Sequence, residues 1–80
     1  MNEYIAAFFS HFGAISYCKE LKAQGIDAKP MPVPRAVSSS CGTCVSYAYS
    51  IPIEVDDCDL EAIYVKAGGA FECVVKISDE

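Results

Sequence analysis

Two prolines, Pro30 and Pro32, constrain the fold of this chain more than any other residues. They follow Ile26–Lys29, where apolar and polar residues alternate as they do in a β-strand. Proline has no backbone N–H, so a strand that carries two prolines cannot donate hydrogen bonds to neighbours on both sides. Such a strand belongs at the edge of a sheet. Any fold for the chain must therefore place residues 26–32 at an edge.

Apolar periodicity predicts the other elements. The apolar run from Tyr4 to Phe9 is typical of a strand that is covered on both faces. Ser10 is then expected to be the N-cap of a helix that ends at Gly25. A second apolar stripe at helical spacing follows an acidic cap at Asp56 or Asp57 and ends at Gly68–Gly69. The expected order is strand 4–9, helix 11–24, edge strand 26–32, loop 33–42, strand 45–50, helix 57–67 and strand 71–77.

This order predicts an α+β fold, the ferredoxin-like βαββαβ two-layer sandwich. Its antiparallel sheet has the strand order 4-1-3-2, which puts the proline-containing second strand at an edge. A chain of 80 residues has material for one core, so residues 1–80 are expected to form a single domain. One face of the first strand, either Tyr4, Ala6 and Phe8 or Ile5, Ala7 and Phe9, is expected to stay uncovered, which leaves a homodimer as an open alternative.

The charge excludes some partners. The chain has 11 acidic and six basic residues and a net charge of −5, whereas proteins that bind nucleic acids concentrate Lys and Arg against the phosphates. We therefore expect no nucleic-acid partner. The N-terminus lacks a basic leader, and no apolar run approaches the roughly 20 residues that cross a bilayer. The sequence predicts a cytoplasmic protein with no membrane association.

The spacing Cys41-Gly42-Thr43-Cys44 marks the candidate site. Two thiols three positions apart can form a disulfide, supply half of a metal site, or act as attacking and resolving nucleophiles. All acidic residues lie outside residues 28–53, and Arg35 lies inside, so the loop favours a thiolate at Cys41. Gly42 leaves room for another protein's thiol to approach. Of the other cysteines, Cys18 and Cys73 are expected in the core and Cys58 is expected to be inert.

Three neighbours complete the candidate site. Arg35 follows Pro32 and Pro34, which are expected to hold it in place, and is expected to steady the Cys41 sulfur. Ser39 and Ser40 have hydroxyls that can donate to it, although they also suit a plain turn. His11 follows the predicted N-cap and is interpreted as a surface residue, because nothing in the sequence links it to Cys41.

The segments 32–35, Pro-Val-Pro-Arg, and 39–42, Ser-Ser-Cys-Gly, resemble the signature of the selenium/sulfur carrier protein-like family. Three further segments extend the resemblance over most of the chain: Phe9-Ser10, residues 18–22 and Gly25-Ile26. The resemblance implies that Cys41 carries sulfur or selenium as a persulfide or perselenide. It also implies that a cysteine desulfurase or enzymes of selenium metabolism act as donor and acceptor.

On this reading the protein is a carrier rather than an enzyme, and it needs no cofactor or metal. Two alternatives remain open. Cys41 and Cys44 can work as a dithiol–disulfide redox pair, or two chains can combine their cysteines around a metal in a dimeric module.

Overall fold

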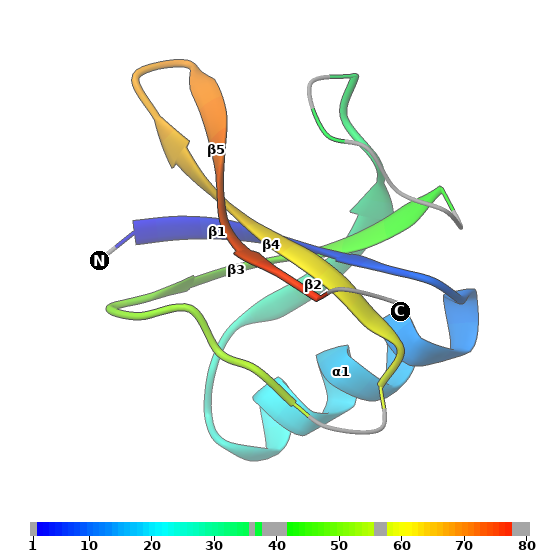
Figure 1. Cartoon of the computed structure of the whole chain (residues 1–80). Helices are drawn as coiled ribbons and strands as arrows, with labels where there is room; N and C mark the ends of the chain where they lie inside the picture. Colours follow the sequence, from blue (N-terminus) through cyan, green and yellow to red (C-terminus); the bar gives the residue numbers. More distant parts are fainter. Residues whose placement is uncertain (1, 36, 38–41, 56–57, 78–80) are drawn as a thin grey trace.

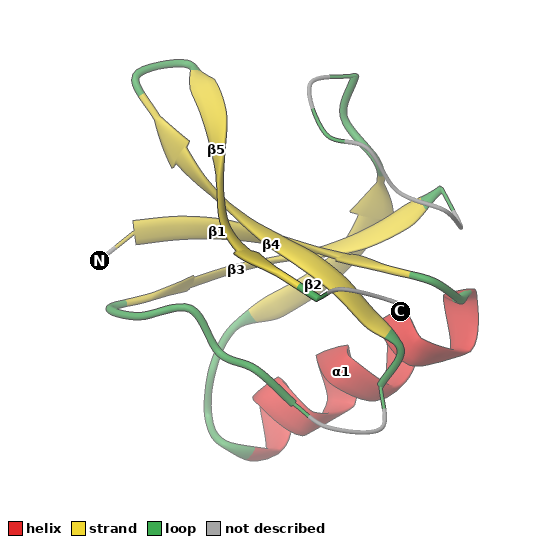
Figure 2. Cartoon of the chain, viewed as in Figure 1, coloured by secondary structure: helices red, strands yellow, loops and turns green. Residues whose placement is uncertain are grey.

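The computed structural model describes residues 2–35, 37, 42–55 and 58–77. One helix packs against one face of an antiparallel sheet (Figures 1 and 2), so the fold is a small α+β structure in two layers. The elements, in chain order, are β1 (Asn2–Phe8), α1 (His11–Ala23), β2 (Ala28–Pro32), β3 (Thr43–Tyr49), β4 (Leu60–Ala67) and β5 (Ala70–Lys76).

The sheet has five strands in the order β2-β3-β1-β4-β5. β2 pairs only with β3, so the strand that contains Pro30 and Pro32 lies at an edge, as the sequence predicts. β3 lies beside β1, which is also as predicted. The predicted order 4-1-3-2 is nevertheless wrong, because an additional strand, β4, lies between the first strand and the last. The ferredoxin-like βαββαβ arrangement is not confirmed.

The second predicted helix is the error behind this difference, because Leu60–Ala67 forms strand β4. The segment satisfies a helical stripe, but it also contains the β-branched and aromatic run Ile63-Tyr64-Val65 that strands favour. Gly68 and Gly69 both have positive φ, 57° and 87°, and connect β4 to β5 as a two-residue hairpin turn. A Gly-Gly pair between two apolar segments is a hairpin signal as well as a helix stop, and here the hairpin forms. The acidic cap proposed at Asp56 or Asp57 lies outside the described residues.

The central strand β1 is buried on both faces. Tyr4, Ala6 and Phe8 face α1 and join the main core, whereas Ile5 and Ala7 face the other side. α1 contributes five buried residues: Gly13, Ala14, Tyr17, Cys18 and Leu21. Because β1 pairs with a strand along each edge and is covered on each face, it holds the two layers together.

Residues 33–42 connect β2 to β3, and the described part of this segment lies on the side of the sheet away from α1 (Figure 1). Val37 is 5% exposed and packs with Ile5, Ala7 and Cys44. Val33, which is partly buried, packs against the same cluster, so two valines of the described connection contact the second face. The β4–β5 hairpin rises on the same side of the sheet in Figure 1, so this face is framed by two projecting segments.

The α1 start is joined to the segment before β4. The Ser10 hydroxyl caps the helix by accepting from the Gly13 N–H at 3.0 Å, and it donates to the Asp59 carboxylate at 2.6 Å. The Phe9 N–H donates to the Asp59 carbonyl at 2.8 Å. Gly13 lies against the backbone of Cys58, where a Cβ at residue 13 would collide with the Cys58 carbonyl oxygen. Glycine is therefore required at this helix position for close approach.

Gly13→Ala should destabilise the protein by up to about 2 kcal/mol. Alanine improves helix propensity by ~1 kcal/mol, but overpacking against a backbone carbonyl costs about 1–3 kcal/mol and no side chain can rotate away to relieve it. Urea unfolding of Gly13→Ala beside Lys22→Ala, an exposed site on the same helix, measures the difference. A Gly13→Ala protein more stable than the wild type would show that the close approach does not exist.

Two core tyrosines form hydrogen bonds with the backbone of Ile53, in the connection between β3 and β4. The Tyr17 hydroxyl donates to the Ile53 carbonyl at 2.7 Å, and the Ile53 N–H donates to the Tyr47 hydroxyl at 3.0 Å. Burial, with a smaller contribution from the hydrogen bond to Tyr47, raises the pKa of Tyr17 far above its ordinary value of 10. Burial also raises the pKa of Tyr47. Both tyrosines therefore keep their protons in the folded state after the unfolded chain has lost them.

Stability should consequently fall as the pH rises above about 10, because the unfolded state then binds fewer protons than the folded state. Each retained proton adds a slope of up to about 1.4 kcal/mol per pH unit. Tyr17→Phe should reduce this slope, whereas Tyr49→Phe, at an exposed position, should leave it unchanged. Urea unfolding between pH 8 and pH 11 measures the slopes, and equal slopes for all three proteins would contradict the assignment.

Candidate functional site

The candidate site is centred on the start of β3. Gly42 and Cys44 are described, and Arg35 lies in the connection between β2 and β3. The other nominated residues lie outside the described part of the chain: Cys41, Ser39 and Ser40.

Gly42 stands immediately before β3 and has φ of +75°. The Val33 N–H donates to the Gly42 carbonyl at 3.2 Å, which extends the pairing of β2 and β3 by one step beyond Pro32 and Thr43. Apart from its two chain neighbours, no described residue places an atom within 4 Å of the position that a Cβ would occupy. The chain beside Cys41 is thus backbone-anchored and sterically open, and its positive φ explains why glycine stands there.

Cys44 is part of β3 and has no exposed surface. Its side chain lies in the cluster of Ile5, Ala7 and Val37 on the face opposite α1. The Cys44 thiol donates to the Pro32 carbonyl with an Sγ–O distance of 3.7 Å. The sequence places the two cysteines of the spacing in similar positions, but the structure buries Cys44 in an apolar cluster that an external thiol cannot reach without local opening.

Arg35 is exposed and follows the Val33-Pro34 pair. The Val37 N–H donates to the Pro34 carbonyl at 3.0 Å, so the chain turns at Arg35. The turn and the buried Val37 hold the backbone on both sides of the guanidinium group. Whether the guanidinium acts on the Cys41 sulfur remains a proposal.

His11 is a residue that the sequence interpretation missed. It is exposed at the first position of α1, and its Nδ1 lies 3.2 Å from the Thr43 hydroxyl oxygen. Thr43 lies inside the Cys41–Cys44 spacing, so the single histidine of the chain contacts the candidate site. The predicted strand order could have indicated that His11 lies near Thr43. Antiparallel pairing of the first and third strands brings the end of one to the start of the other, and the helix begins there.

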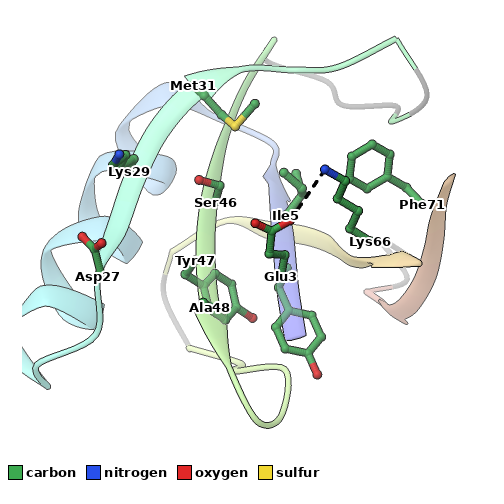
Figure 3. A pocket seen from close by; sticks show the side chains of 11 residues that line it. Glu3, Ile5, Asp27, Lys29, Met31, Ser46, Tyr47, Ala48, Lys66 and Phe71 are labelled. Atoms are coloured by element: carbon green, nitrogen blue, oxygen red, sulfur yellow. Dashed lines mark ion pairs between the residues drawn. The ribbon is translucent and has the colours of Figure 1, made fainter. Parts of the chain in front are cut away.

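A pocket of ≈ 370 Å³ lies elsewhere on the face opposite α1 (Figure 3). Ile5, Ser46 and Met31 line its interior, and Lys66 and Glu3 form an exposed ion pair at 3.7 Å along its side. None of its lining residues was nominated from the sequence. Its lining extends from Glu3, which pairs with Ala48 far from Gly42, to Met31, which pairs with Cys44, so the pocket reaches the strand pair beside Cys44.

The other cysteines differ in their surroundings. Cys18 is buried and donates to the Ala28 carbonyl, with Sγ and O 3.5 Å apart, which confirms its core position. Cys73 is exposed on β5, so its predicted core position is wrong. Cys58 is buried before β4 rather than lying in a helix. Within residues 2–35, 37, 42–55 and 58–77, no three His, Cys, Asp or Glu side chains are grouped as metal ligands.

The family model described as "Putative Se/S carrier protein-like" matches residues 3–64. This match covers the chain from β1 into β4, including the whole candidate site, and the chain therefore belongs to that family. The family name indicates a carrier of selenium or sulfur, which implies enzymes that load and unload it. No curated protein and no solved structure matches the chain. In the described residues, no helix is both long and apolar enough to cross a membrane.

Under native conditions, iodoacetamide should modify Cys44 at least about tenfold more slowly than Cys73, because only opening of the structure exposes a buried thiol. Timed alkylation followed by peptide mapping measures both rates in one sample. Alkylation in concentrated urea is the control and should bring the two rates close together. Equal rates in the native protein would contradict the burial of Cys44.

Proposed function

We propose that this protein carries sulfur or selenium as a persulfide or perselenide on Cys41 and passes it between a donor and an acceptor enzyme. The observation that carries the proposal is the family match over residues 3–64, which includes Cys41 and the residues around it. We propose a cysteine desulfurase or an enzyme of selenium metabolism as the partner. We place the carrier in the cytoplasm, where thiols stay reduced.

The transfer step needs one nucleophile. The Cys41 thiolate attacks the terminal sulfur of the donor's persulfide, so a bond from Cys41 to that sulfur forms while the donor's sulfur–sulfur bond breaks. The donor leaves as a thiolate that takes up the persulfide proton, and an acceptor thiolate removes the sulfur by the same exchange. No external oxidant or reductant is consumed. The open space beside Gly42 supports this role, because the donor sulfur must approach Cys41 from outside.

The burial of Cys44 supports a carrier over a dithiol pair in two ways. Cys44 is fully buried, whereas a resolving thiol must reach the mixed disulfide that Cys41 forms. Burial also keeps Cys44 from attacking a persulfide on Cys41 and releasing sulfide prematurely. We assign Arg35, Ser39 and Ser40 the role of stabilising the charged sulfur, Arg35 by charge and the serines by hydrogen bonds.

The carrier proposal predicts different results for the two cysteines. Cys44→Ser should still gain one sulfur atom from a desulfurase supplied with cysteine, or one selenium atom with selenocysteine, whereas Cys41→Ser should gain none. Intact-mass spectrometry before and after treatment with a reductant measures the loading. For a dithiol pair, the wild type would instead lose the mass of two hydrogen atoms reversibly as the oxidant takes up their electrons, and either substitution would abolish that loss. Loading that persists in Cys41→Ser would overturn the proposal.

A further inference from the structure

We infer that the start of α1 is the docking surface through which a persulfide-bearing protein reaches the candidate site. The α1-start surface consists of Phe9, His11 and Phe12 together with Gly42 and Thr43 at the start of β3. This inference rests on the proposed carrier function and adds where the donor binds. The donor it fits presents a persulfide cysteine on an exposed segment of a folded protein.

Exposed aromatic rings are the first support. Phe12 is 77% exposed, the highest value among the large apolar side chains of the described residues, and Phe9 is 38% exposed. The two phenylalanines lie on either side of Ser10 and His11 in the turn from β1 into α1. Single exposed apolar residues are common, but two phenylalanines at one turn form a patch, and buried aromatic side chains contribute strongly to protein interfaces.

The second support is the contact between this turn and the candidate site. The Nδ1 of His11 lies 3.2 Å from the Thr43 Oγ1, so the residue between the two phenylalanines reaches the Cys41–Cys44 segment. In Figure 1 the end of β1, the start of α1 and the start of β3 lie together at one end of the sheet. A protein that covers Phe12 is thereby placed beside Gly42, which is exposed and has no described residue other than its chain neighbours within 4 Å of its Cβ position.

Hydrogen bonding at this turn suits the same partner. The first turn of α1 contains no acidic residue, although the chain has a net charge of −5. The nearby Asp59 carboxylate accepts a hydrogen bond from the Ser10 hydroxyl at 2.6 Å. When the Thr43 hydroxyl donates to Nδ1 of His11, the ring proton is on Nε2, which can donate to an anionic sulfur. With that tautomer, an incoming persulfide anion meets aromatic rings and the Nε2–H donor of His11, while an exposed carboxylate, Asp59, lies beside Ser10 at the same turn.

The test separates docking from sulfur transfer. In the Cys41→Ser background, which cannot be loaded, binding to a cysteine desulfurase is measured by calorimetry with and without Phe12→Ala. We expect Phe12→Ala to weaken binding about tenfold, as truncation of a central interface residue does, and Phe12→Leu to restore most of it. Ile51→Ala is the matched control, because Ile51 is 59% exposed and follows the other end of β3.

Loading is then compared for two sulfur sources in proteins that keep Cys41. Phe12→Ala should raise the desulfurase concentration needed for half-maximal loading about tenfold, whereas loading by inorganic polysulfide, which needs no docking, should match that of the wild type. Unchanged binding and unchanged desulfurase loading in Phe12→Ala would overturn the docking assignment. A wild type that binds the desulfurase through Phe12 but takes sulfur from neither source would overturn the carrier function and leave the docking surface standing.

A second copy of the chain is the competing occupant of this surface. Sedimentation of the wild type alone distinguishes it. A wild-type dimer that becomes a monomer in Phe12→Ala would assign the surface to self-association and overturn donor docking. A monomer in both proteins, or a dimer in both, supports the donor assignment when the binding loss is seen.

Discussion

The close approach of α1 to the segment before β4 is the constraint on which the rest of the site depends. Gly13 permits it, because any side chain there would meet the Cys58 carbonyl, and the Ser10 hydroxyl links the helix cap to Asp59. These contacts fix where the helix begins relative to the sheet. His11 follows the cap directly, so its contact with Thr43 is a consequence of the same junction. A helix start that shifted by one residue would turn the imidazole away from β3.

The two ends of β3 have different surroundings. At the start of β3, Gly42 is exposed to solvent, whereas Cys44 is buried in a cluster with Val37. Farther along, Ser46 lines a hollow that Glu3 and Lys66 border. The edges of the sheet are protected as well. The prolines of β2 remove donors, and a register irregularity between β4 and β5 disturbs the other edge, so the sheet resists extension by another strand.

The burial of Cys44 gives a physical meaning to the Cys41–Cys44 spacing. In a dithiol protein both thiols must meet during each cycle, and an apolar cover over one of them would slow every turnover. In a carrier, the same cover protects the persulfide from reduction by its neighbour. The second cysteine is then a small apolar core residue, packed against Ile5 and Ala7, rather than a reactant.

The sequence by itself determined the features that depend on local chemistry. Pro30 and Pro32 required an edge strand because they lack donors, and Ser10 specified a helix cap, whereas the family segments nominated Cys41 as the proposed carrier residue. The sequence did not decide between helix and strand for Leu60–Ala67, because its apolar residues satisfy both periods and Gly68–Gly69 can end a helix or turn a hairpin. Only pairing with β1, which needs a partner along its second edge, made that segment a strand. Tertiary structure likewise determined the surroundings of Cys44 and His11. Cys44 is buried with Ile5, Ala7 and Val37, and His11 contacts Thr43, and both arrangements join residues far apart in the chain.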